Sequence, residues 1–330
     1  VSTFKLNPET YSAEVQKLLE SSTVIEYTHP TSLNSGQMGE FISAVRRKGY
    51  NPDAVVCFME PLGQEFYDNL PGDVKVISTS ATGVDNKNFN LAAERGILNT
   101  NAPGALYNEV GEMAIELMLR GTHMTPKLED ISGAGAQVGC SMEDGRHYSL
   151  HDSAVGIIGL GQIGRRIAQS LTALVDTVDG GSISYYTPSR HPDDENFLNR
   201  LIESQVTGKI YLANAVGNGH SSENLDDYVI VEGKDEISDG SVISYKPVKY
   251  HDSLYKLVDD SDVVVISATL NDETYNLIGE DVLLRMKERG ERTGRKSVVV
   301  NMARGPIVDE SAMAKALREG WVGAYVTDVA

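Results

Sequence analysis

A glycine-rich turn is the part of the sequence whose residue types and spacing most clearly suggest chemistry. The apolar run 154–158 leads directly into Gly159-Leu160-Gly161-Gln162-Ile163-Gly164. Between a strand and a helix, the first glycine of this spacing permits a tight turn, the second lets a pyrophosphate approach the backbone, and the third lets the helix pack closely on the strand. The helix N-terminus adds free N–H groups and a positive dipole. The spacing predicts a dinucleotide site rather than a glycine turn without a ligand, and the predicted contacts are Gly159, Gly161, Gln162, Ile163 and Gly164.

The end of the next strand, 182–186, bears on which dinucleotide is bound. Proteins that use NAD commonly place Asp or Glu there, where it accepts hydrogen bonds from the ribose 2′-OH. Here the nearest acids, Asp176 and Asp179, precede the strand and belong to its other end. Hydroxyls and a guanidinium follow it instead, and these groups suit a 2′-phosphate. NADP is therefore predicted, with NAD as the alternative, and the predicted contacts are Thr187, Ser189 and Arg190. For Arg190, a solvated loop position is the other interpretation.

Strands and helices alternate along the chain and would position these residues. Continuous apolar runs predict buried strands, and apolar residues at helical spacing predict the helices between them. Such alternation indicates an α/β fold with parallel sheets and right-handed crossovers. Strands are predicted at 23–28, 53–59, 74–79, 154–158, 182–186, 262–267, 297–301 and 323–329. Helices are predicted at 8–20, 39–48, 89–94, 110–124, 281–289 and 310–319, and at the end of 151–174.

A polar, acidic and turn-rich stretch at about 191–247 interrupts this alternation. It is predicted to be an insertion, with an extra hairpin around 228–231 and 241–245. Glycine also gathers at 132–145, where a break between elements is predicted.

Length, charge and cysteine usage narrow the class of protein. The chain has 330 residues, which suits two domains, and its formal net charge of -18 disfavours nucleic acid and anionic membrane surfaces as partners. That charge is interpreted as a source of solubility, with a salt-adapted host as the alternative. Two cysteines far apart predict neither a disulfide framework nor a zinc site, and no metal is expected. The sequence predicts no membrane span and no signal segment, so a cytoplasmic location is expected.

Four separated motifs together resemble the D-isomer-specific 2-hydroxyacid dehydrogenases, a family that includes glyoxylate/hydroxypyruvate reductase, phosphoglycerate dehydrogenase and formate dehydrogenase. They are 74–85 with 92–97, the turn at 155–164, the strand 261–267 leading to Thr274, and 300–310 with 323–329. The resemblance implies a flavodoxin-like substrate domain at 1–102 and a Rossmann NAD(P)-binding domain at 103–330. It also implies reversible hydride transfer between NAD(P)H and a small 2-oxo acid, which gives a D-2-hydroxy acid, in a homodimer.

The resemblance assigns roles to residues at the ends of predicted strands. Ala81, Thr82 and Gly83 match the loop whose backbone N–H groups bind the substrate carboxylate, as an anion nest can. Arg304 matches the catalytic Arg, whose planar fork can hold the carboxylate and the carbonyl oxygen together. A plain turn and a surface Arg are the structural alternatives. The remaining implied cofactor contacts are Met302, Ala303 and Asp328 at the nicotinamide, and Thr269 near the adenosine, where the family often has Pro.

The proton donor of the family is not found in this sequence. The resemblance implies a His paired with a Glu that raises its pKa, and both are expected after Asp328. The seven histidines, at 29, 123, 147, 151, 191, 220 and 251, match no position of that His and are expected to be structural or solvated.

Three interpretations of this difference stay open. The chain starts without Met and stops in an apolar run, so a fragment of a longer enzyme is expected. The alternatives are a short protein that binds the cofactor without turnover and a chain completed by a partner. On the same scaffold, a corepressor-like dinucleotide sensor or an oxidation of the formate or phosphite type would be the competing functions.

Overall fold

The chain folds into two compact units, Val1–Leu106 (unit 1) and Tyr107–Ala330 (unit 2). The computed structural model describes Ser2 and residues 12–26, 33–58, 60–123, 149–218, 229–231, 234–236 and 242–329. The division falls just before the first long helix of unit 2, whereas the sequence placed the domain boundary after residue 102.

Unit 1 contains a parallel sheet of three strands in the order β1-β2-β3: β1 (Ala54–Cys57), β2 (Val76–Thr79) and β3 (Leu98–Thr100). Parallel bridges join Ser2 to both Val56 and Glu26. These bridges extend the order to Glu26, Ser2, β1, β2, β3, which is the 2-1-3-4-5 order of flavodoxin-like folds. The predicted strand at 23–28 is reduced, among its described residues, to the single bridge at Glu26, because one residue, Ser2, is its only described partner.

Two helices of unit 1 begin at an asparagine that caps them. Asn34 forms a capping box with Gln37 and starts α2 (Ser35–Arg47), and Asn88 caps α4 (Phe89–Glu94), the helix predicted at those residues. Helices α1 (Ala13–Glu20) and α3 (Gln64–Asn69) begin without a side-chain cap. The residues predicted to start the first helix, around 8, lie outside the described part of the chain. Met38, Ile42, Phe66 and Ile77 are fully buried and form the centre of this unit's core.

Unit 2 is built on a six-stranded parallel sheet in the order β12-β11-β10-β4-β5-β9. In chain order this is the 3-2-1-4-5-6 arrangement of the Rossmann fold, so the predicted fold class of parallel α/β units is confirmed. The predicted strands of this unit are found within two residues of their predicted ends. They are β4 (Ala154–Ile158), β5 (Ser182–Tyr186), β10 (Val263–Ile266), β11 (Val298–Asn301) and β12 (Ala324–Thr327), whereas β9 (Lys249–His251) was not predicted.

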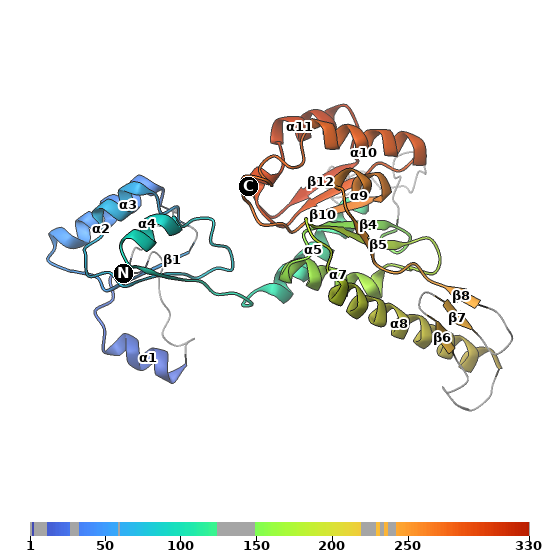
Figure 1. The fold of residues 1–330 in the computed structure, drawn as a ribbon, viewed down its shortest axis with the longest axis horizontal. Helices are drawn as coiled ribbons and strands as arrows, with labels where there is room; N and C mark the ends of the chain where they lie inside the picture. Colours follow the sequence, from blue (N-terminus) through green and yellow to red (C-terminus); the bar gives the residue numbers. More distant parts are fainter. Residues whose placement is uncertain are drawn as a thin grey trace, which may run out of the picture. The chain divides into compact units, whose positions relative to one another are not determined.

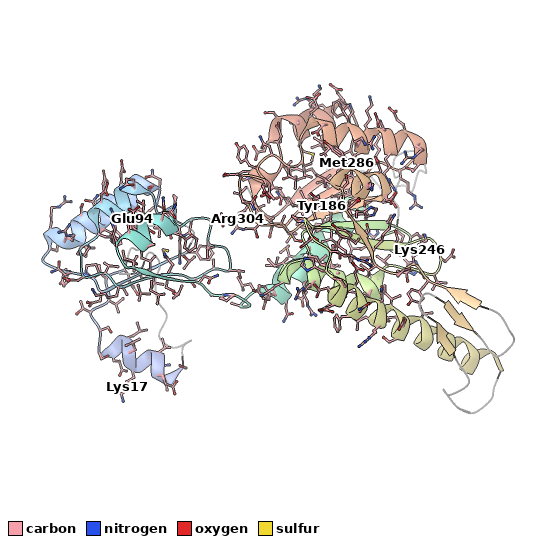
Figure 2. The ribbon with its side chains drawn as sticks, in the orientation of Figure 1. Lys17, Glu94, Tyr186, Lys246, Met286 and Arg304 are labelled. Carbon is pink, nitrogen blue, oxygen red and sulfur yellow. The ribbon has the colours of Figure 1, made fainter. Side chains whose placement is uncertain are left out.

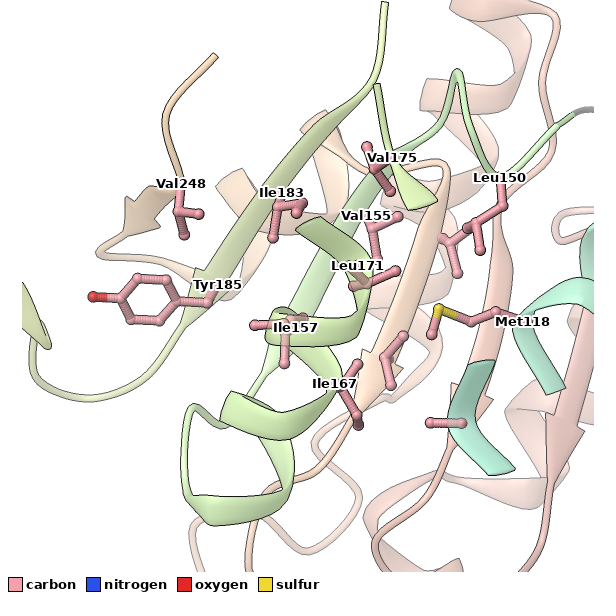
Figure 3. Close-up of a cluster of buried hydrophobic side chains, with 14 of the residues drawn as sticks. Met118, Leu150, Val155, Ile157, Ile167, Leu171, Val175, Ile183, Tyr185 and Val248 are labelled. Carbon is pink, nitrogen blue, oxygen red and sulfur yellow. The ribbon is translucent and has the colours of Figure 1, made fainter. Parts of the chain in front are cut away.

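Helices cover both faces of this sheet (Figure 1). On one face, α5 (Tyr107–Thr122), α7 (Gln162–Leu174) and α8 (Pro192–Asn218) pack over alternate residues of the strands, with Ile157, Leu171 and Tyr185 at the centre (Figure 3). On the other face, α9 (Leu254–Asp260), α10 (Glu280–Thr293) and α11 (Glu310–Arg318) form a second core. Both faces of the central strands are therefore buried, which explains their continuous apolar sequences.

The stretch at 191–247 contains a long helix that the sequence reading did not predict. Leu198, Ile202 and Val206 on α8 are buried in the core of unit 2, as are Tyr245 and Val248 after the last inserted strand. The acidic residues around 193–195 concealed the helical spacing of these apolar side chains. The predicted hairpin is instead a three-stranded antiparallel sheet, in which β7 (Lys234–Glu236) lies between β6 (Val229–Val231) and β8 (Val242–Ser244).

Candidate functional site

The glycine turn joins β4 to α7 at the carboxyl edge of the unit 2 sheet. Gly159 has a φ of 92°, and a Cβ at that position would lie 2.8 Å from the backbone of Ala268. A Cβ at Gly164 would lie 2.0 Å from the Gly159 carbonyl oxygen, so only glycine lets the helix approach the turn. At Gly161 no described atom lies within 4 Å of such a Cβ, and the backbone there is open.

This geometry fits the diphosphate of a dinucleotide. Helix α7 begins at Gln162 with Gly161 as its N-cap residue and no side-chain cap, so its first N–H groups face the open side. Gln162 is exposed, whereas Ile163 packs partly against the core, so of these two only Gln162 offers its side chain to a ligand.

At the end of β5, a buried carboxylate holds the predicted Arg. Arg190 donates from Nε to both oxygens of Glu195, at 2.9 and 3.1 Å, and from Nη2 to Oε2 at 2.7 Å. Glu195 is only 5% exposed and also accepts a hydrogen bond from the Tyr185 hydroxyl. Burial opposes ionisation of Glu195, but the hydrogen bonds from Arg190 and Tyr185 outweigh it and lower the pKa of this carboxyl. Arg190 itself is 62% exposed, so its orientation is fixed while its outer edge faces solvent.

Thr187 and Ser189 lie in the same turn. Thr187 is buried, and its hydroxyl donates to the Ser189 carbonyl oxygen, so it braces the turn between β5 and Arg190. A second guanidinium, that of Arg165 on α7, pairs with Asp194 at 3.0 Å. Sequence reasoning missed Arg165, Asp194 and Glu195. The run of acids after Pro192 is a helix-start signal that could have indicated carboxylates at this end of α8.

Arg304 follows β11 at the same edge of the sheet. Asn301 is fully buried, accepts from the Ala303 N–H at 3.0 Å, and donates to the Arg304 carbonyl oxygen at 2.8 Å. The guanidinium of Arg304 donates to the Ala303 carbonyl oxygen at 2.7 Å and its side chain is half-buried (Figure 2). Asn301 was not singled out from the sequence, although a buried Asn directly before a turn is a recognisable turn signal.

The other predicted cofactor contacts of unit 2 also lie at this edge. Met302 and Ala303 are buried, and the Met302 N–H donates to the Ile266 carbonyl oxygen at 3.0 Å. Partial burial raises the pKa of the Asp328 carboxyl, and the charge of Arg304 acts against that rise. Thr269 is exposed, at the start of the loop after β10.

The register of the sheet brings the glycine turn and Arg304 to one edge. Ile158 of β4 is in register with Ile266 of β10, and Ile266 with Asn301 of β11. Because all three strands are parallel, their carboxyl ends meet there, with only β10 between the turn and the Arg304 segment.

The predicted carboxylate loop lies in unit 1, after β2. The Ala81 carbonyl oxygen accepts from the Ala102 N–H at 3.0 Å, and the Thr82 carbonyl oxygen accepts from Asn101 Nδ2 at 2.8 Å. Gly83 follows in the same partly exposed loop.

Four of the seven histidines are in the described part of the chain. His151 contacts Asp152 and Asp176, and His191 contacts Asp194, whereas His123 is exposed. His251 on β9 is 3% exposed, and burial lowers its pKa. Within the described residues, no group of three or more His, Cys, Asp or Glu side chains could hold a metal ion. No helix in the described ranges is long and apolar enough to cross a membrane.

Comparison with known proteins agrees with this arrangement. Residues 234–330 match the family model for the NAD binding domain of D-isomer specific 2-hydroxyacid dehydrogenases. Glyoxylate reductases from Korarchaeum cryptofilum and Thermofilum pendens are 26% and 28% identical over 279 and 283 residues, covering 84% of this chain. The chain spans 65% and 64% of the length of these relatives.

Solved structures share the fold. A glyoxylate reductase from Paecilomyes thermophila gives a TM-score of 0.66 at 24% identity, covering 96% of this chain and 78% of that one. A D-lactate dehydrogenase from Aquifex aeolicus, complexed with NAD and lactic acid, gives 0.65 at 20% identity, covering 96% and 73%. Fold and motifs thus define a two-domain α/β protein with a Rossmann unit. The chain is similar to the D-isomer-specific 2-hydroxyacid dehydrogenases, and the match of residues 234–330 to the NAD binding domain of that family confirms the resemblance seen in the sequence.

Proposed function

We propose that this protein is an oxidoreductase that transfers a hydride between NAD(P)H and a small 2-oxo acid, with glyoxylate or hydroxypyruvate as the substrate and a D-2-hydroxy acid as the product. The observation that carries the proposal is the shared carboxyl edge of the unit 2 sheet, where the open Gly161 backbone and the Arg304 segment are separated by one strand. The relatives named above are glyoxylate reductases, which supports this substrate class.

In this proposal, Arg304 and the loop at 81–83 bind the acid. The guanidinium of Arg304 is planar and always charged, so it can hold a carboxylate and the adjacent carbonyl oxygen in one plane and stabilise negative charge on that oxygen. Asn301 fixes the backbone from which Arg304 projects. The nicotinamide of the dinucleotide, when bound, would supply or accept the hydride, and the His that the family resemblance implies would supply or accept the proton on the substrate oxygen. The backbone of Met302 and Ala303 and the carboxyl of Asp328 are the proposed nicotinamide contacts.

The test of Arg304 is its replacement by Lys, which keeps the positive charge but cannot donate two parallel hydrogen bonds from a planar group. We expect Arg304→Lys to lower kcat/KM for glyoxylate or hydroxypyruvate at least about 100-fold, with the Kd of NADPH unchanged. The loss of NADPH absorbance reports turnover, and fluorescence titration reports cofactor binding. Arg285→Lys is the matched control, because Arg285 is half-exposed on α10 and pairs with Asp259. Near-normal turnover in Arg304→Lys would refute the role of this residue, while tight NADPH binding without turnover in the unaltered full-length protein would favour a dinucleotide sensor.

For the cofactor we propose NADP over NAD. Two guanidiniums, those of Arg165 and Arg190, lie near the end of β5, and no acid stands at the tip of the strand itself. Each is paired with a carboxylate from α8, which reduces the net positive charge that a 2′-phosphate would meet. Arg190→Ala should raise the Kd of NADPH about tenfold and the Kd of NADH by less than twofold, because only the 2′-phosphate of NADPH needs the guanidinium. Equal kcat/KM with the two cofactors in the unaltered protein would contradict the preference.

The remaining parts of this proposal concern assembly and location. We propose that unit 1 supplies the loop at 81–83 for the acid, that unit 2 supplies Arg304 and the dinucleotide site with Thr269 near the adenosine, and that the protein is a cytoplasmic homodimer formed through its Rossmann unit. The family resemblance supports the division of roles between the units and the dimer. Light scattering on the purified protein measures the oligomeric state, and a monomeric mass would exclude the dimer.

A further inference from the structure

Three hydrogen bonds connect the loop at 81–83 with the segment that follows β3. The Ala102 N–H donates to the Ala81 carbonyl oxygen at 3.0 Å, and Asn101 Nδ2 donates to the Thr82 carbonyl oxygen at 2.8 Å. The Thr82 hydroxyl donates to the Ala102 carbonyl oxygen at 3.4 Å. Two consecutive carbonyl groups of the loop are therefore held from the same side, by residues 101 and 102.

The direction of these carbonyl groups decides the direction of the N–H groups. In a trans peptide, the C=O and the following N–H point to opposite sides of the chain. The Thr82 and Gly83 N–H groups therefore point away from the 101–102 segment. Neither N–H donates a hydrogen bond to another residue in the described part of unit 1. Two neighbouring donors on one side of a loop form the concave arrangement that binds anions.

We propose that Asn101 is a positioning residue, which turns the Gly83 N–H toward the carboxylate of the substrate through its bond to the Thr82 carbonyl oxygen. The inference rests on the proposed function, because it assumes that the loop binds a carboxylate. Asn101 is exposed, so its side chain contributes little to the core of unit 1. What its amide does is hold one peptide plane, the plane that contains the Gly83 N–H.

Only an amide donor of this length fits the role. Asp at position 101 keeps the shape but has no N–H, and its charge would repel both the Thr82 carbonyl oxygen and an incoming carboxylate. Ala removes the donor without adding charge. The peptide plane between Thr82 and Gly83 would then be free to rotate in both variants, and the donor aimed at the anion would be lost.

The test uses oxalate, a small planar acid, as the probe on full-length protein saturated with NADPH. We expect Asn101→Ala to raise the Kd of oxalate about tenfold, because the Gly83 N–H is no longer directed at the charged carboxylate. Asn101→Asp should raise this Kd further, because its negative charge also repels the carboxylate. The Kd of NADPH should stay within twofold in both variants. In the unaltered protein, oxalate should shift the amide NMR signals of Thr82 and Gly83.

The matched control is Asn69→Ala. Asn69 Nδ2 also donates to a backbone carbonyl oxygen, that of Glu65, at 2.8 Å, at the end of α3 in the same unit. We expect this variant to lose at least as much stability in thermal melts, because the Ser43 hydroxyl also donates to Asn69 Oδ1. Oxalate should bind it normally, so that a general effect on unit 1 is separated from the effect on the loop.

Unchanged oxalate affinity in Asn101→Ala, with normal affinity in the unaltered protein, would overturn the positioning role and leave the proposed function intact. If the unaltered protein binds NADPH but neither binds oxalate nor shows the two amide shifts, the proposed function fails and the role of Asn101 fails with it.

Discussion

At the scale of single residues, the structure pairs Arg165 and Arg190 with carboxylates that the sequence did not suggest. Glu195 illustrates this, because it is buried and accepts hydrogen bonds from both Arg190 and Tyr185. Burial and the hydrogen bond to Glu195 raise the pKa of Tyr185, which keeps this hydroxyl protonated and donating. The turn that follows β5 is therefore fixed by one carboxylate.

Replacing Glu195 by Gln should reduce stability in a pH-dependent way. We expect a loss of about 2 kcal/mol at neutral pH, because the hydrogen bonds to a charged acceptor are weakened. The folded pKa of Glu195 lies below its ordinary value of 4.5, so its contribution is present above that pH and is lost as the pH falls through the folded pKa. The difference in the free energy of unfolding between the unaltered protein and Glu195→Gln, measured with urea, should therefore decrease below about pH 4.5.

The control for this experiment is Glu116→Gln, since Glu116 pairs with Arg120 on the exposed side of α5. That change should cost less than about 0.5 kcal/mol. If Glu195→Gln lowers the free energy of unfolding by the same amount at every pH, Glu195 is not an ionised, buried residue.

At the scale of elements, the two later glycines of the turn between β4 and α7 have different tasks. Gly164 has no room for a side chain, since its Cβ would lie 2.0 Å from the Gly159 carbonyl oxygen, whereas Gly161 has open space and a negative φ of -73°. One glycine therefore serves helix packing, and the other leaves the backbone accessible.

Alanine at each position should separate these tasks. Gly164→Ala should lower stability by about 2 kcal/mol or more, because the first turn of α7 must move away from β4. Gly161→Ala should melt close to the unaltered protein but bind NADPH at least about tenfold more weakly, because the methyl group occupies space that a diphosphate needs. Thermal melts and fluorescence titration measure the two effects. If Gly161→Ala binds NADPH normally, the diphosphate does not rest on this backbone.

At the scale of the whole molecule, each unit has a core of its own. Met38, Ile42 and Phe66 belong to the core of unit 1, and those of unit 2 lie on the two faces of its six-stranded sheet. Units with separate cores can unfold separately. Calorimetry should therefore show two transitions, and NADPH at 100 times its Kd should stabilise the unit that binds it by about 2.7 kcal/mol.

This expectation assigns the dinucleotide to unit 2. The transition of unit 2 should move to higher temperature, while that of unit 1 should move less. Equal shifts of both transitions would mean that the dinucleotide contacts the two units alike. A shift of the unit 1 transition alone would contradict the assignment.

The local patterns of the sequence were sufficient to predict the α/β class, the glycine turn and most strands. Spacing within an element decides whether a face is apolar and whether a turn can form, and both are visible in consecutive residues such as 154–164. Helix α8 was missed because its buried side chains are diluted by acidic neighbours, and β9 because it has only three residues.

Tertiary structure alone decided which side chains meet. Asn101 reaches Thr82 across 19 positions, and the Arg304 segment reaches the edge that carries Gly159 only through the register of β10. Such contacts depend on strand order and on the path of each crossover, which no run of consecutive residues encodes. The sequence by itself determined what each segment would become, and the order and register of the strands within each sheet decided which of those segments would lie side by side.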